Sequence, residues 1–267
     1  MHKLIIFDLD GTLAESKQPL SLEMAGLLAR LLAATQVAII SGGALPQFLK
    51  QVVDRLPPEA NLRNLYLLPT SGATLYEYSP STSIDSAQDK SLGTSADAWK
   101  KVYEERLSEA DASHIERAMR DAATHTGLID FSAPAWGERV EYRGSQVTLS
   151  ALGQKAPVKE KQAWDPDKSK RRALQAALAE RLPQFSVRMG GATSIDVTKS
   201  GIDKAYGIRK LCERLNIPES EALYIGDQLT EGGNDEAVFK TNVGTKSVNS
   251  PSDTARLIEA LLESKEV

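Results

Sequence analysis

Cysteine and histidine are scarce in this chain of 267 residues. Because Cys212 is its single cysteine, the chain cannot form an internal disulfide, and a reducing compartment is expected. The three histidines are widely separated along the sequence and do not have the spacing of zinc ligands. These absences exclude a disulfide-rich scaffold and a zinc-stabilised domain.

Long apolar runs and an excess of basic charge are also missing. No stretch is long and apolar enough to cross a bilayer, and two aspartates interrupt the first apolar run, so we expect neither a membrane span nor a secretory signal. The net charge of −4 gives no electrostatic case for binding nucleic acid or an acidic membrane. We therefore expect a cytoplasmic globular protein with no nucleic-acid or membrane partner.

Short apolar runs alternate with amphipathic helical patterns at both ends of the chain. Strands are predicted over residues 3–8, 36–41 and 65–70, with helices from residue 21 and over 45–56. The pattern resumes with a helix over 203–217, a strand over 222–227 and a last helix over 252–264. This alternation predicts a parallel sheet with crossover helices.

The middle of the chain has a different character. Residues 79–98 are rich in Ser, Thr, Asp and Gly, which is typical of a domain boundary. Polar helices are predicted over 99–124 and 168–182, and period-two alternation predicts strands over 139–144, 145–153 and 185–197. The predicted fold is therefore α/β. Residues 1–78 and 199–267 form a Rossmann-like parallel-sheet core with helices on both faces, and 79–198 form an inserted α+β domain.

Polar residues follow three of the predicted core strands. The first strand ends in Asp8 and Asp10, the second in Ser41 and Gly42, and the late strand in Asp227. Ligands of open parallel sheets bind beyond the carboxyl ends of the strands, so neighbouring strands would bring these groups to one edge. Clustered carboxylates favour a hard cation, and Mg²⁺ is the best candidate.

Paired aspartates beside Mg²⁺ suit phosphoryl transfer. One aspartate can attack phosphorus to form an aspartyl-phosphate. A second aspartate two residues later, on the same side of an extended chain, can protonate the leaving oxygen and then activate water. A hydroxyl, backbone N–H groups and a lysine would balance the charge of the phosphoryl group.

The segment "DLDGTL" (8–13) resembles the first motif of the haloacid-dehalogenase superfamily. Ser41, Lys204 and "GDQLTEGGND" (226–235) match its second, third and fourth motifs in the right order. The resemblance implies that Asp8 is the nucleophile and Asp10 the general acid/base. The other residues to which it gives roles are the Mg²⁺ ligands Asp8, Asp10 (through its backbone carbonyl) and Asp227, the phosphate-binding Ser41, Gly42 and Lys204, and the supporting Asn234 and Asp235.

Three longer segments are similar to the eukaryotic-type phosphomannomutases, namely 140–154, 189–208 and 226–239. This resemblance implies that the inserted domain is an α/β cap in which Arg143, Ser194 and Asp196 contact the substrate. The chain departs from the family pattern at Gln154, which stands in place of an arginine, and at Lys161, which falls near another. Gln cannot replace the charge of an arginine that would hold a second phosphate. The motif-two segment "SGGAL" (41–45) also differs from the mutase pattern.

The expected function is therefore a Mg²⁺-dependent phosphatase of a small phosphorylated metabolite, with a sugar phosphate as the favoured substrate. The alternative is a phosphomannomutase that interconverts mannose 1-phosphate and mannose 6-phosphate. A third possibility is a non-catalytic phosphate or metal binder. The chain is expected to be a monomer or a cap-mediated homodimer.

Simpler structural roles also remain open for several of these residues. Ser41 can cap the helix that follows it, and Lys204 can be a solvated helix lysine. Arg143 can be a surface strand residue, and Lys161 is expected to be exposed. Hinges between core and cap are expected near residues 79 and 198.

Overall fold

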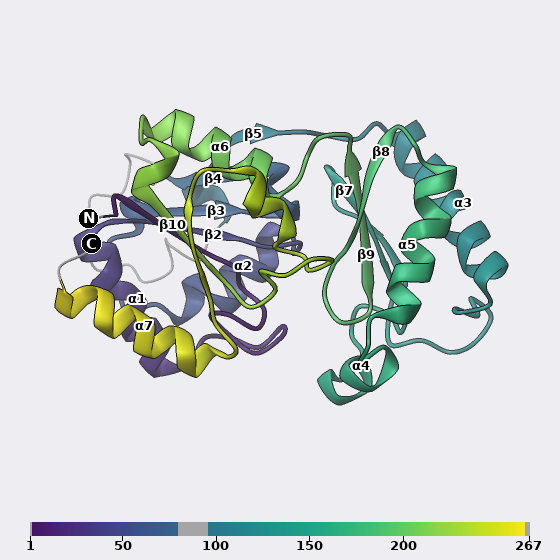
Figure 1. Cartoon of the computed structure of the whole chain (residues 1–267), viewed down its shortest axis with the longest axis horizontal. Helices are drawn as coiled ribbons and strands as arrows, with labels where there is room; N and C mark the ends of the chain where they lie inside the picture. Colours follow the sequence, from purple (N-terminus) through teal and green to yellow (C-terminus); the bar gives the residue numbers. More distant parts are fainter. Residues whose placement is uncertain (1, 80–95, 265–267) are drawn as a thin grey trace. The chain divides into compact units, whose positions relative to one another are not determined.

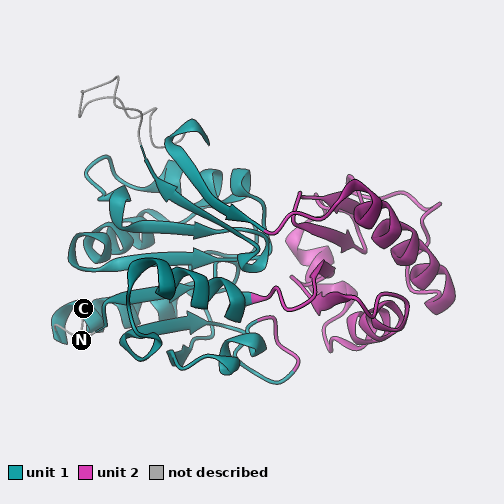
Figure 2. Cartoon of the chain, turned by 90° about the horizontal axis from the view of Figure 1, so that it is seen from above, with its two compact units in different colours: residues 1–104, 204–231, 235–267 teal, residues 105–203, 232–234 magenta. Residues whose placement is uncertain are grey.

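The computed structural model describes residues 2–79 and 96–264, which form two compact units (Figure 2). The first unit contains the chain up to Glu104, residues Lys204–Glu231 and the chain from Asp235 onward. The second contains Glu105–Asp203 together with Gly232–Asn234. No helix among the described residues is long and apolar enough to span a membrane.

The first unit is built on a seven-stranded sheet in the order β11-β10-β1-β2-β3-β4-β5. Its strands are β1 (Leu4–Phe7), β2 (Gln36–Ile40), β3 (Leu65–Leu68), β4 (Thr74–Tyr78), β5 (Trp99–Glu104), β10 (Ala222–Gly226) and β11 (Gly244–Ser247). The five strands from β11 to β3 run parallel, and β4 and β5 are antiparallel additions at one edge. The central strand β1 therefore lies between β10 and β2.

Helices cover both faces of this sheet. They are α1 (Leu22–Ala34), α2 (Leu45–Gln51), α6 (Lys204–Leu215) and α7 (Pro251–Ser264). Alternate residues of β1 explain the layering, because Ile5 and Phe7 pack with α1, α2 and α7, whereas Leu4 and Ile6 pack with α6. Figure 1 shows α6 on the opposite side of the sheet from α1 and α7. The predicted core with helices on both faces is confirmed.

The second unit has a four-stranded antiparallel sheet in the order β6-β7-β9-β8. Its elements are α3 (Glu109–Thr126), β6 (Val140–Tyr142), β7 (Gln146–Ser150), α4 (Val158–Trp164), α5 (Ser169–Arg181), β8 (Phe185–Met189) and β9 (Ser194–Lys199). The apolar residues of β7 and β9 pack in one cluster with α3 and α5. Within β7 and β9, polar residues alternate with these apolar residues, so the sheet has one apolar face and one polar face.

Two sequence expectations about residues 79–104 need correction. Residues Trp99–Glu104 were expected in a helix, but they form β5, which pairs with β4 in the core sheet. The first unit therefore extends to Glu104, whereas the core was expected to end at residue 78. Most of the predicted boundary at 79–98 lies outside the described residues. The polar composition of β5 follows from its place at the sheet edge, where Lys100 and Lys101 are exposed.

Short 3₁₀ turns complete the structure at Val53–Arg55, Leu62–Asn64, Thr70–Gly72, Ala96–Ala98, Glu219–Glu221 and Glu236–Lys240. The turn at Thr70–Gly72 meets α6 through a pair of glycines. A Cβ added to Gly207 would lie 2.7 Å from the Gly72 Cα, and one added to Gly72 would lie 2.9 Å from the Gly207 Cα. This close backbone approach fixes the first turns of α6, where Lys204 is located.

We predict that Gly207→Ala destabilises the protein although alanine is the better helix former. The added methyl group meets backbone, and such overpacking costs about 1–3 kcal/mol. Gly26→Ala in α1 is the matched control, because a Cβ there meets nothing within 4 Å, and it should stabilise by about 0.5–1 kcal/mol. Urea unfolding of both variants measures the difference. A stabilising Gly207→Ala would show that the approach of the two backbones is not constrained.

Candidate active site

The carboxyl ends of three neighbouring strands supply the predicted core residues. Asp8 directly follows β1, Ser41 follows β2 and Asp227 follows β10. Asp8 is held in place by its backbone, because its N–H donates to the Ile225 carbonyl oxygen at 3.0 Å. Since β1 lies between β10 and β2, the sheet topology brings the three strand ends together as the sequence predicts.

Lys204, the first residue of α6, is buried between two carboxylates. Its Nζ donates to Asp8 Oδ1 at 2.5 Å and to Asp235 Oδ1 at 2.6 Å. The Lys204 side chain is only 3% exposed, so it is not the solvated helix lysine that remained open. An ammonium group buried this deeply needs such partners, because an unpaired buried charge is strongly destabilising.

Tyr224 completes this cluster and was missed in the sequence. It lies in β10, is fully buried, and its hydroxyl donates to Asp235 Oδ1 at 2.6 Å. The same hydroxyl accepts a hydrogen bond from Lys204 Nζ at 3.1 Å. The sequence did contain a signal for Tyr224, because it lies in a strand that was expected to be buried. A buried tyrosine hydroxyl usually has a hydrogen-bond partner.

The cluster carries more negative than positive charge. Burial raises the pKa of the Asp8 carboxyl well above its ordinary value, and the Asp235 and Asp227 carboxylates raise it further, while Lys204 opposes the rise. Burial also raises the pKa of Asp227. Burial alone would lower the pKa of Lys204, but the Asp235 and Asp8 carboxylates raise it above its ordinary value. The Lys204 ammonium group therefore stays charged, but its single positive charge does not balance the carboxylates of Asp8, Asp227 and Asp235.

The oxygens of Asp8 and Asp227 fit a hard divalent cation. Asp8 Oδ2 is buried and accepts no hydrogen bond from the described residues. The Asp227 carboxylate lies against the turn after Asp10, because a Cβ on Gly11 would come within 2.7 Å of Asp227 Oδ2. Across residues 2–79 and 96–264, no three His, Cys, Asp or Glu side chains form a metal-binding group. Asp8 and Asp227 would therefore need backbone or ligand oxygens beside them, which agrees with the proposed Asp10 carbonyl.

The turn after β2 lacks the helix cap that remained open as a role for Ser41. The N-cap of α2 is Ala44, and no side chain caps this helix end. Ser41 is buried, and its backbone carbonyl accepts a hydrogen bond from Ser71 N–H at 2.9 Å. The capping role that was open for Ser41 is therefore wrong, and phosphate binding by Ser41 and Gly42 stays a prediction.

The predicted cap residues and Asn234 belong to the second unit. Asp196 is buried on the polar side of β9 and accepts a hydrogen bond from the Thr148 hydroxyl at 2.8 Å. Ser194 lies two residues earlier in the same strand, so its side chain is on the same face. The substrate contacts of these residues stay predictions.

Arg143 directly follows β6 and is partly buried, with little of its side chain exposed, so it is not a surface strand residue. Its side chain is 8% exposed and donates to Glu141 Oε2 at 2.6 Å and to Gln154 Oε1 at 3.3 Å. Lys161 was expected to be exposed, but it is buried and donates to the Gln154 backbone carbonyl at 3.1 Å. Gln154 thus joins two buried cationic side chains within the second unit.

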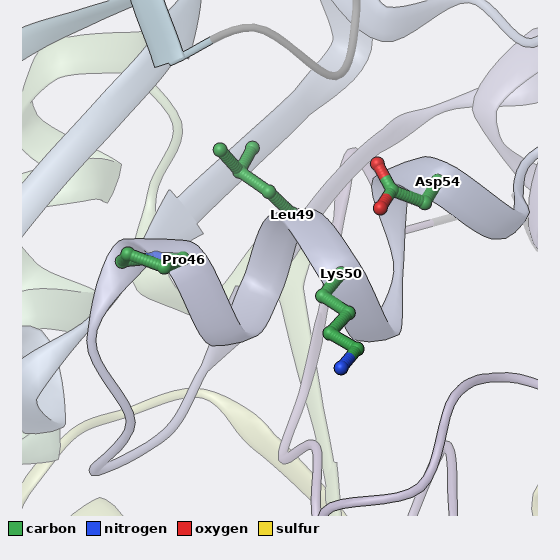
Figure 3. Close-up of a pocket in the computed structure, with 4 residues that line it drawn as sticks. All are labelled: Pro46, Leu49, Lys50 and Asp54. Carbon is green, nitrogen blue, oxygen red and sulfur yellow. The ribbon is translucent and has the colours of Figure 1, made fainter.

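A separate hollow borders α2 and the turn after it. It is lined by Pro46, Leu49, Lys50 and Asp54 (Figure 3). None of these residues belongs to the buried cluster around Lys204, so this hollow is not the candidate phosphate site.

Relatives of known name match most of the chain. The model of the family described as eukaryotic phosphomannomutase matches residues 126–264. A phosphomannomutase of Encephalitozoon cuniculi is 25% identical over 268 residues, which cover 97% of this chain and 93% of the relative. These matches confirm the resemblance to the haloacid-dehalogenase superfamily and its phosphomannomutase-like branch.

Solved structures share the fold. An IMP-bound IMP-nucleotidase of Plasmodium falciparum has a TM-score of 0.67 at 15% identity, covering 98% of this chain and 68% of that chain. A haloacid dehalogenase-like hydrolase of Bacteroides thetaiotaomicron has a TM-score of 0.60 at 16% identity, covering 98% of this chain and all of the other. At these identities the likeness concerns the α/β fold alone, which it confirms.

We predict that Tyr224→Phe lowers the stability of the protein. The substitution removes one donor from Asp235 and one acceptor from Lys204, and hydrogen bonds to charged groups contribute about 1.5–3 kcal/mol. Tyr66→Phe is the matched control, because the Tyr66 hydroxyl on β3 makes no hydrogen bond to the described residues. Thermal unfolding measures both variants. Equal melting temperatures would show that the Tyr224 hydroxyl does not stabilise the cluster.

We predict that Mg²⁺ raises the melting temperature of the wild-type protein and has little effect on Asp227→Asn. A ligand that binds only the folded state stabilises it by about 2.7 kcal/mol at a hundredfold excess over its Kd. Asp121→Asn on the exposed face of α3 should keep the full Mg²⁺ response. A Mg²⁺ shift of wild-type size in Asp227→Asn would contradict the assignment of this carboxylate as a ligand.

Proposed function

The chain belongs to the eukaryotic phosphomannomutase family, and we propose that it transfers a phosphoryl group between hexose phosphates through an aspartyl-phosphate on Asp8. The observation that carries the proposal is the environment of the two Asp8 carboxylate oxygens. One of its oxygens accepts a hydrogen bond from Lys204, and the other is buried without a partner among the described residues. When ionised, this carboxylate can attack phosphorus through one oxygen while the other holds the cation.

The proposed reaction has two steps. In the first, an Asp8 oxygen forms a bond to phosphorus, the bond to the sugar oxygen breaks, and the leaving oxygen takes a proton from Asp10. In the second, a hydroxyl group gives its proton to Asp10 and attacks phosphorus, which frees Asp8. When bound by Asp8, Asp227 and the Asp10 carbonyl, Mg²⁺ would neutralise charge on the phosphoryl group. Lys204 holds the nucleophile and balances the same charge.

The acceptor of the phosphoryl group distinguishes the two activities: a mutase transfers it to a sugar hydroxyl, and a phosphatase transfers it to water. The phosphomannomutase family and its Encephalitozoon relative favour a hexose phosphate as acceptor. The phosphatase was favoured because Gln154 replaces an arginine and Lys161 was expected to be exposed. Arg143 and Lys161 both donate to Gln154, and Arg143 is also paired with Glu141, so cationic side chains do lie beside the position where the mutases have an arginine. This arrangement supports the mutase, and hydrolysis becomes the second candidate.

Asp8→Asn should abolish phosphoryl transfer, because the amide cannot form the aspartyl-phosphate. We expect turnover of a panel of sugar phosphates with Mg²⁺ to fall at least about a thousandfold, as for other catalytic nucleophiles. The folded state should persist, and thermal unfolding provides that control. Persistent turnover in Asp8→Asn would exclude the covalent mechanism. Absence of turnover in the wild-type protein as well would favour a non-catalytic phosphate binder.

Products formed from mannose 1-phosphate separate the two enzymatic candidates. The wild-type protein is incubated with mannose 1-phosphate, Mg²⁺ and a hexose bisphosphate, and mannose 6-phosphate and free phosphate are measured together. We expect mannose 6-phosphate to form faster than free phosphate. Faster release of free phosphate would favour the phosphatase.

A further inference from the structure

The carboxylate of Asp10 is held by three hydrogen-bond donors. The Lys17 backbone N–H donates to Oδ1 at 2.6 Å, and the Gln51 side-chain amide donates to the same oxygen at 3.4 Å. The Gln47 side-chain amide donates to the other oxygen, Oδ2, at 3.2 Å. Oδ1 therefore has two donors and Oδ2 has one, so Oδ2 is the oxygen with room for a transferred proton.

Both amides come from α2, where Gln47 and Gln51 are four residues apart and project from the same face. Gln51 is buried and fixed a second time, because its Nε2 also donates to the Gln18 carbonyl oxygen at 2.6 Å. Gln47 contacts the motif-two turn, since its Oε1 lies 2.4 Å from the position of a Cβ on Gly43. A side chain at residue 43 would occupy the space that the Gln47 amide uses.

We propose that Gln47 is a positioning residue for the acid/base carboxylate of Asp10, and that Gly43 provides the space for it. Without the Gln47 amide, the remaining donors to Asp10 among the described residues are both on Oδ1, and the carboxylate can rotate about its side-chain bonds. A donor on Oδ2 fixes both oxygens and so fixes the direction in which the proton is passed. Gln47 is neutral, so it orients the carboxylate without adding a competing charge at the phosphoryl site. The proposal rests on the acid/base role of Asp10 in the proposed function.

The contact between Gln47 and residue 43 also bears on why this position is a glycine. Gly43 adopts no left-handed conformation that would require glycine. The contact with Gln47 provides a steric reason for a residue without a side chain at this position.

The test compares Gln47→Met, which keeps the length of the side chain and removes its donor, with Lys50→Met on the exposed side of the same helix (Figure 3). Protonation of the leaving group matters for a sugar alkoxide and little for 4-nitrophenolate, which leaves without help. Single-turnover cleavage of mannose 1-phosphate and the burst of 4-nitrophenolate from 4-nitrophenyl phosphate are therefore measured with Mg²⁺. Both assays report formation of the phosphoenzyme.

For Gln47→Met we expect mannose 1-phosphate cleavage to slow about tenfold with KM unchanged, because small misplacements of a catalytic group cost up to about a hundredfold. The nitrophenolate burst should keep its wild-type rate. Lys50→Met should behave as the wild type in both assays. Gly43→Ala should reproduce the Gln47→Met pattern, and the double variant should be no slower than either single variant.

Asp10→Asn is the reference for this experiment. If it does not slow the sugar phosphate selectively, the acid/base role of Asp10 in the proposed function is wrong. If Asp10→Asn shows the selective loss and both Gln47→Met and Gly43→Ala match Lys50→Met, the positioning role of Gln47 is wrong. Equal slowing of both substrates by Gln47→Met and Gly43→Ala would also overturn it, because that result indicates a general structural defect.

Discussion

The ammonium group of Lys204 between Asp8 and Asp235 is the interaction on which the rest of the first unit depends. It joins the end of β1, the start of α6 and the loop after β10, three segments that lie far apart in the sequence. All three side chains are almost fully buried. Breaking such a cluster by removing one partner leaves an uncompensated buried charge, which costs several kcal/mol. The positions of the three segments are therefore strongly coupled.

This coupling explains why backbone contacts far from the chemistry matter. Lys204 can reach Asp8 only if the first turns of α6 lie close to the sheet, and the Gly72–Gly207 contact permits that approach. Gly226 has a related role, because a Cβ there would lie 2.4 Å from Asp235 Oδ2. Small residues at these contacts thus set the distances within the charged cluster, and Tyr224 then fills the third hydrogen-bonding direction of the ammonium group.

The sequence was sufficient to place residues in the candidate site where both the residue type and its position at a strand end indicate a role. Asp8, Ser41 and Asp227 end apolar strands, and parallel topology requires such ends to meet at one edge. Tyr224 and Gln47 could not be assigned this way, since one resembles a core residue and the other a surface residue of an amphipathic helix. β5 was wrongly expected to be helical, because an edge strand with lysines on an exposed face lacks the apolar run of a central strand. The roles of Ser41, Arg143, Ser194 and Asp196 stay predictions.

The balance of charge in the cluster also bears on the order of events. Asp8, Asp227 and Asp235 carry three negative charges when ionised, and Lys204 supplies one positive charge. A phosphoryl dianion approaching this arrangement alone would be repelled, although Lys204 is present. Two further positive charges would make the cluster neutral, and a divalent cation supplies that number. The electrostatics thus favour binding of cation and phosphate together. The Lys204 charge lowers the pKa of the Asp8 carboxyl against the effect of burial, and so favours the ionised form that the proposed attack on phosphorus requires.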